Sequence, residues 1–246
     1  MNTTDLLNQL FKVGTDLLQN KGGAVQPGSW QQPNAQKPAD NSPLGSLAGL
    51  LSGKGGAALA GGVVGLLLGT QGGRKMGGTV LTYGGIAALG AMAYKAYGDW
   101  QTQNNATTTQ GPQTIDRVSS AQAEQHSRAI LIALIAAAKA DGHVDEHERR
   151  LIEGEFNKLT QNPDLSSWVE LELQKPLDPT AIAAAATTPE IASEMYLASV
   201  LAVDEENFME RAYLQELAKQ LRLEPSLQAQ LAEQAKQAIA LCHSAP

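Results

Sequence analysis

Carboxylate and imidazole side chains crowd two short stretches of the chain. The first stretch, residues 141–148, contains Asp141, His143, Asp145, Glu146, His147 and Glu148. The second begins with Asp204, Glu205 and Glu206 and is followed by Glu210. Carboxylate oxygens are the ligands that Ca²⁺, Mg²⁺ and Mn²⁺ prefer, and imidazoles would also admit Zn²⁺. The pattern predicts a divalent-cation site with ligands Asp141, Asp145, Glu148, Asp204 and Glu210.

Helix capping accounts for part of the same pattern. Asp145 with Glu148, and Asn207 with Glu210, have the spacing of a cap and its reciprocal partner, which needs no ligand. Asp141 and Asp204 are different, because a carboxylate at a helix C-terminus opposes the helix dipole. A cation among such like charges would relieve their repulsion, but solvated turns remain the alternative interpretation.

The two acidic stretches belong to a repeat of helical hairpins. Residues 136–152, AAAKADGHVDEHERRLI, resemble residues 198–214, ASVLAVDEENFMERAYL. Each run has an apolar helix, an Asp at its end, a short acidic turn, then a cap and a Glu-Arg pair. We therefore expect two hairpins related by pseudo-twofold symmetry, with their acidic turns brought together.

The C-terminal half reads as an all-α domain over 120–243. Caps and Pro residues at first helical positions predict helices at 121–140, 146–160, 165–174, 179–186, 189–203, 208–222 and 225–242. The cap expected for the third of these is Asp164. Connections this short favour an antiparallel bundle of about seven short helices.

The N-terminal half divides into four segments by composition. We expect an amphipathic helix at 1–19, which either packs on another helix or lies at a membrane surface. Residues 20–43 and 98–119 are polar and rich in linker residues, and both are predicted to be linkers. Residues 44–97 form a glycine-rich apolar segment. Its charge-free runs, 55–73 and 76–94, are about as long as a bilayer span, and predict a membrane-embedded helical hairpin or a single span near 79–97.

Glycine recurs at every fourth position within that apolar segment. On a helix, this spacing lines up small residues in a groove where a second helix can approach closely. The row predicts helix packing, and a homo-oligomer, through Gly61, Gly65, Gly69, Gly73 and Gly77.

Charge distribution narrows the class of partner. Residues 1–118 hold eight Lys or Arg and five Asp or Glu, whereas residues 119–246 hold ten and twenty. The acidic half would repel phosphates, so we expect no nucleic-acid partner. The glycines do not follow dinucleotide or phosphate-loop spacing, and no nucleophile constellation is visible. We therefore expect a protein that is not an enzyme, with a metal-dependent hydrolase kept as the weaker alternative.

A family resemblance rests on the two acidic runs. KADGHVDEHERRLI, residues 139–152, resembles the acidic signature of the TerB-like domain of tellurite-resistance proteins. Residues 201–231 and the glycine-rich region look like the bacterial YebE family of inner-membrane proteins. The resemblance implies an all-helical domain, membrane association and metal binding, with Asp141, Asp145 and Glu148 in the first motif, and Asp204 and Glu210 in the second.

Together these features predict a membrane-associated protein of the bacterial inner membrane with a cytoplasmic acidic domain. That domain would bind a divalent cation, an unknown partner protein, or both, in a stress or envelope context. The alternative is an oligomeric membrane scaffold built on the glycine row, with no metal site.

Overall fold

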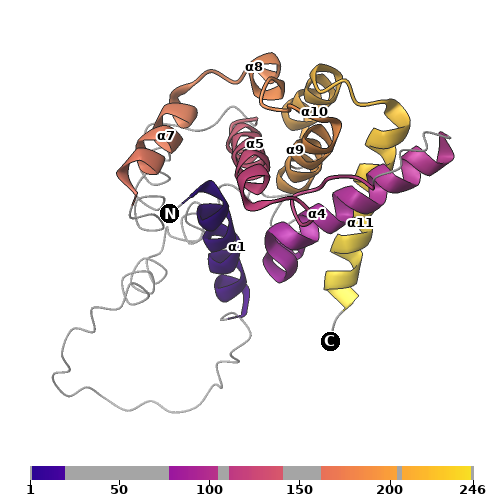
Figure 1. Ribbon diagram of the computed structural model, residues 1–246, viewed down its shortest axis with the longest axis horizontal. Coiled ribbons are helices and arrows are strands. Elements are labelled where there is room, and N and C mark those ends of the chain that lie inside the picture. The colour runs from indigo at the N-terminus through magenta and orange to yellow at the C-terminus, as the bar shows by residue number, and fades with distance from the viewer. Residues whose placement is uncertain (1, 20–77, 105–110, 141–161, 204–206, 245–246) are drawn as a thin grey trace, which may run out of the picture.

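The chain folds into helices throughout the part that the structure describes. This computed structural model describes residues 2–19, 78–104, 111–140, 162–203 and 207–244 (Figure 1). No strand occurs among them, so the all-α class is confirmed. The helices are α1 (Thr3–Gln19), α4 (Gly78–Gln103), α5 (Ser120–Ala138), α7 (Pro163–Gln174), α8 (Pro179–Ala183), α9 (Pro189–Ala202), α10 (Phe208–Gln220) and α11 (Pro225–Ser244).

Side-chain caps fix where the C-terminal helices begin. The predicted caps Asp178, Thr188 and Asn207 are confirmed: each accepts a hydrogen bond from a backbone N–H of the first turn of its helix. Helix α7 differs from the prediction, because its cap is Asn162 and not Asp164. Pro163 occupies the first helical position there, where its missing N–H costs nothing, so the cap falls two residues before the predicted one.

Helices α5 and α9 form the centre of the core. Each packs more extensively on the other than on any other described helix. Large apolar side chains on α5, such as Ile130 and Leu134, are fully buried, as are Met195 and Leu197 on α9. These two helices lead directly into the two acidic stretches of the sequence, 141–148 and 204–206.

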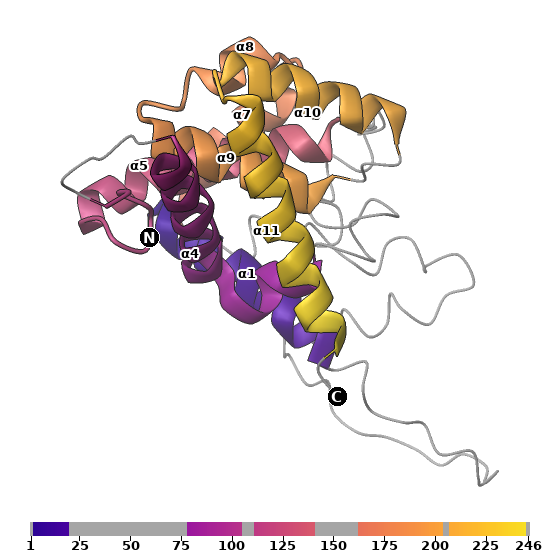
Figure 2. The ribbon, with the colours of Figure 1, turned by 90° about the vertical axis from the view of Figure 1, so that its right-hand side faces the viewer.

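Helix α4 spans the molecule beneath this pair and contacts α1, α9 and α11 (Figures 1 and 2). Trp100 donates a hydrogen bond from Nε1 to Ser226 Oγ at 3.0 Å, which joins α4 to the start of α11. Helix α4 is kinked at Gly85, whose φ of 54° is accessible to glycine at little cost. A Cβ at Gly85 would lie 3.7 Å from Phe11 Cβ, so α1 packs directly against the kink.

The prediction of an inner-membrane protein is wrong. None of the helices that the structure describes combines the length and apolarity required to cross a membrane. Helix α4 contains most of the predicted second span, and its apolar residues Ile86, Leu89 and Ala93 are buried. These side chains pack against neighbouring helices, which explains an apolar run without a lipid environment. The other predicted span, 55–73, lies outside the described residues.

The N-terminal helix is part of the same packed body. Its apolar residues Leu6, Leu7, Leu10 and Phe11 are at most 2% exposed, in contact with α4 and α5. Of its two expected roles, this corresponds to packing on another helix. The predicted linker 98–119 also contributes to the core, since α4 continues to Gln103 and Ile115 is buried.

Candidate functional site

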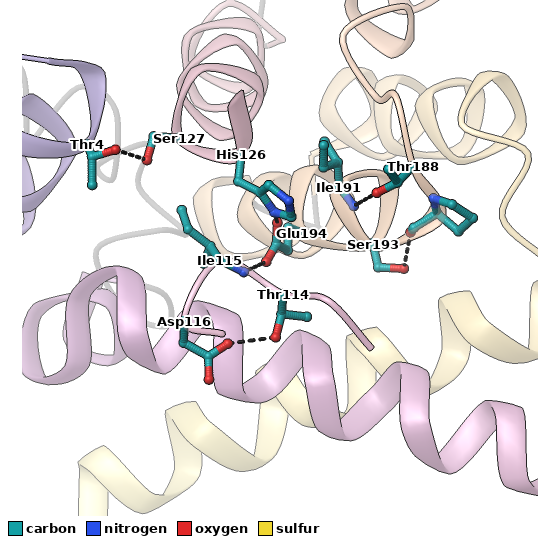
Figure 3. A network of polar contacts seen from close by, with 11 residues as sticks. Thr4, Thr114, Ile115, Asp116, His126, Ser127, Thr188, Ile191, Ser193 and Glu194 are labelled. Atoms are coloured by element: carbon teal, nitrogen blue, oxygen red, sulfur yellow. Dashed lines mark hydrogen bonds and ion pairs between the residues drawn. The ribbon is translucent and has the colours of Figure 1, made fainter. Parts of the chain in front are cut away.

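A histidine and a glutamate meet inside the core, between α5 and α9 (Figure 3). His126 Nδ1 lies 2.5 Å from Glu194 Oε2, and their side chains are 5% and 0% exposed. The second oxygen, Glu194 Oε1, accepts a hydrogen bond from the backbone N–H of Ile115 at 2.6 Å. We call these three groups the Glu194 network. It ties α5, α9 and the segment 111–118 together at one buried point.

The environment of Glu194 favours its neutral form. Burial raises the pKa of the Glu194 carboxyl above its usual value, and the nearby Asp116 carboxylate acts in the same direction. The bonds from His126 and from the Ile115 N–H stabilise the charged form and offset part of that rise. Both side chains are buried, and their contacts hold α5, α9 and the segment 111–118 together.

The segment 111–118 is itself fixed against α4. Thr114 Oγ1 donates to Asp116 Oδ1 at 2.6 Å, and the Arg117 guanidinium lies 3.8 Å from the centre of the Tyr94 ring. A Cβ built on Gly90 of α4 would lie 2.6 Å from Asp116 Oδ1 and 2.9 Å from Ile115 Cγ2. Glycine at this position therefore lets the segment approach α4 closely enough to supply the Ile115 N–H.

Replacing Gly90 by alanine is expected to destabilise the protein. Alanine normally stabilises a helix interior relative to glycine, but here the methyl group clashes with the segment, at a cost of about 1–3 kcal/mol. Gly98 on the same helix is the matched control, because its Cβ would meet only Pro112 Cγ at 4.0 Å. Urea unfolding should show a loss for Gly90→Ala and a gain of up to about 1 kcal/mol for Gly98→Ala. Equal effects would show that the close approach is unimportant.

Glu124 on α5 binds the first turn of α1. Its carboxylate accepts from the backbone N–H of Thr3 at 2.7 Å, and from the N–H and hydroxyl of Thr4, both at 3.1 Å. Burial alone would raise the pKa of the Glu124 carboxyl, but these hydrogen bonds together bring it below the usual value. The charged form is therefore the one that holds α1.

Glu124→Gln is expected to cost about 1 kcal/mol at pH 7, the size of a lost helix cap. The folded-state pKa of Glu124 is lowered, so its contribution is present above the unfolded pKa of about 4.3 and is lost as the pH falls through the folded value. Urea midpoints of wild type and variant should therefore converge in acid. Glu233→Gln, at an exposed position on α11, serves as the control. Its urea midpoint should stay close to that of wild type throughout. A difference for Glu124→Gln that is constant from pH 7 to pH 3 would contradict this role.

A cleft of about 170 Å³ opens between α5, α7 and α8. Its walls include Ile132, Ile135 and Ile182, and its rim carries Lys139 and Glu172. Burial lowers the pKa of the Lys139 ammonium, which donates to the backbone carbonyl of Lys175; Glu172 opposes that shift. Aliphatic walls with a few charged groups suit the binding of an apolar side chain from a partner.

Ser199 Oγ and Tyr213 Oη are buried close to each other between α9 and α10, and neither has another hydrogen-bond partner among the described residues. Burial raises the pKa of the Tyr213 hydroxyl, an effect that the nearby Ser199 hydroxyl opposes only in part. Tyr213 shares a helix face with Glu210, three residues earlier, whose side chain is also buried. We call Ser199, Glu210 and Tyr213 the α9–α10 oxygen cluster. It flanks the acidic stretch 204–206 on both sides in sequence.

Most of the predicted ligands and the glycine row lie outside the described residues: Asp141, Asp145, Glu148, Asp204, Gly61, Gly65, Gly69, Gly73 and Gly77. Glu210 is described, and lies in the first turn of α10 after the cap Asn207. Within the described ranges, no three His, Cys, Asp or Glu side chains come together as a metal-binding group. His126, Glu194 and Glu124 were not predicted as site residues, although a lone carboxylate inside the apolar run 191–203 was a visible signal for Glu194.

Comparison with known proteins gives two matches. Residues 53–235, most of the chain, match a family described as "Protein of unknown function (DUF533)". Over 100 residues the chain is 32% identical to a Yersinia enterocolitica protein described as "Uncharacterized protein in ampR 5'region". The matched stretch covers 41% of this chain and 72% of the Yersinia protein. No solved structure matches the chain. Helix α1 lies before the matched range.

Proposed function

Since the chain belongs to the DUF533 family, we propose a function from its own residues: it is a non-catalytic protein whose TerB-like helical domain binds a divalent cation and, in response, a partner protein. The observation that carries this proposal is the α9–α10 oxygen cluster. Two buried hydroxyls that have, within the described part of the chain, only each other as a polar neighbour leave part of their hydrogen-bonding capacity unused, which costs free energy, so their retention calls for a reason.

Oxygen donors of this kind fit a hard cation. Hydroxyl and carboxylate oxygens suit Ca²⁺, Mg²⁺ or Mn²⁺, and the cluster offers both from residues that flank the Asp204 stretch in sequence. Asp204 and Glu210 would hold the ion in this half, and Asp141, Asp145 and Glu148 in the other. The ion would supply charge neutralisation, which lets carboxylates gather at the ends of α5 and α9.

Coupling to a partner follows from the packing of α5 on α9. Both helices precede acidic stretches, and the Glu194 network fixes them to each other. The cleft between α5, α7 and α8 includes Lys139, two residues before Asp141. An ion held by Asp141 would therefore bind two residues from Lys139 in sequence and act through Lys139 on the lining of the cleft, where a partner side chain would dock.

Thermal melts of the full chain test cation binding. The protein is stripped of metal and titrated with Ca²⁺, Mn²⁺ and Zn²⁺. An ion at a hundredfold its dissociation constant adds about 2.7 kcal/mol, and each kcal/mol raises the midpoint of a protein this size by about 2–4 °C. Asp141→Ala and Asp204→Ala should abolish the shift, whereas Asp99→Ala, at an exposed position on α4, should retain it.

Tyr213→Phe separates ligation from simple burial. Because Ser199 is its only polar neighbour among the residues that the structure describes, removing the Tyr213 hydroxyl should change the melting midpoint of the metal-free protein by no more than a few degrees. If the hydroxyl also ligates the ion, the same variant should show a smaller metal-induced shift than wild type. The absence of a shift with every ion in the wild type would leave the acidic stretches as solvated turns and contradict the proposal.

A further inference from the structure

Helix α1 occupies a groove formed by α4 and α5. Four apolar side chains fill it, with Leu6, Leu7 and Leu10 at 0% exposed and Phe11 at 2%. The helix contacts the body of the protein through these two helices (Figure 1). The groove therefore recognises one amphipathic helix with a Leu-Leu-x-x-Leu-Phe stripe.

The groove also recognises the N-terminus of that helix. The first N–H groups of any helix lack partners within the helix, and are commonly capped by its own preceding residue. Here the Asn2 side chain accepts from the N–H of Asp5, while the N–H groups of Thr3 and Thr4 donate to Glu124 on α5. The buried Ser127 hydroxyl adds a 2.9 Å contact to the Thr4 hydroxyl. The polar contacts to α1 thus come from α5, and the apolar contacts come from α4 and α5.

Helix α1 could in principle fill the α4–α5 groove of its own chain or that of a second copy. Residues 20–77 separate it in sequence from α4, and it lies before the range that matches the family. A helix so far from α4 in sequence can occupy the groove of its own chain or that of another copy. Exchange of identical elements between copies forms dimers at low cost, because the exchanged contacts are the same ones.

We propose that α1 docks between chains as well as within one: the α4–α5 groove binds α1 of a second copy, linking two copies by reciprocal exchange. The occupant is set by the chemistry of the groove, since the second copy carries the same Leu stripe and the same Thr3–Thr4 first turn. Exchange is favoured when the protein concentration approaches the effective concentration of α1 at the groove of its own chain.

Exchange is tested on the full chain carrying two different affinity tags. The two forms are mixed at high concentration, warmed to just below the melting midpoint, cooled, and purified through one tag. We expect the second tag to co-purify. An excess of a peptide of residues 1–19 present during warming should reduce the co-purified fraction about tenfold or more. The same peptide with Leu7→Asp and Leu10→Asp should leave that fraction unchanged. Absence of co-purification, or co-purification that the wild-type peptide does not reduce, would overturn the proposal.

Complementation gives a second, independent readout. A chain with Leu7→Asp and Leu10→Asp keeps its groove but cannot fill it, and a chain with Glu124→Arg keeps α1 but has a damaged groove. Light scattering of the equimolar mixture should show a one-to-one dimer that each chain alone lacks. If either variant loses its helical circular dichroism, the tagged wild-type experiment decides alone. A mixture of two folded variants that stays monomeric would count against exchange.

Discussion

Glu194→Ala is expected to lower the free energy of unfolding by about 2–5 kcal/mol, because it leaves two buried polar groups without their hydrogen-bond partner. The substitution leaves His126 Nδ1 and the N–H of Ile115 buried without their hydrogen-bond partner. Each of those groups then bears its full desolvation penalty. Urea unfolding at pH 7, followed by circular dichroism, measures the loss.

The control for Glu194→Ala is Glu170→Ala on α7, where the carboxylate is exposed and accepts only from Gln174 in the same helix. That change should stay within about 0.5 kcal/mol of wild type. A loss below about 1 kcal/mol for Glu194→Ala would mean that the buried network does not hold α5 to α9.

Leu10→Ala is expected to cost about 2–5 kcal/mol, because it opens a cavity where α1 packs on α4 and α5. Leu10 is fully buried and its neighbours come from both helices, which limits how far the site can collapse. The measurement is the urea midpoint, with the slope checked to be unchanged so that the shift reports stability.

Leu171→Ala is the matched control for Leu10→Ala. The substitution is chemically the same as Leu10→Ala, but Leu171 lies on α7 and is 59% exposed. We expect its effect to stay within about 0.5 kcal/mol. Similar small effects at both positions would show that α1 is not held in the groove, and would also remove the basis for exchange between copies.

Local sequence signals predicted the helices well because their causes are local. A cap followed by proline, as at Asp178-Pro179 and Thr188-Pro189, satisfies an N–H of the first turn and presets the backbone, whatever the rest of the fold does. The error at α7 was local too: Asp164 lies inside the helix because Pro163 already takes its first position.

Tertiary partners could not be predicted from the same signals. His126 and Glu194 are 68 residues apart in sequence, and only the packing of α5 on α9 brings them together. The membrane prediction failed for a related reason. An apolar run such as the one in α4 has the same composition whether lipid or neighbouring helices cover it, and here helices α1, α9 and α11 do so.

The central claim is that the buried pair His126 and Glu194 locks together the two helices that lead into the acidic stretches. A double-mutant cycle tests it most directly, with urea unfolding of wild type, His126→Ala, Glu194→Ala and the double variant. We predict a coupling energy of about 1.5–3 kcal/mol, because each side chain loses its partner in either single variant. Additive losses, with a coupling near zero, would contradict the lock and leave α5 and α9 held by apolar packing alone.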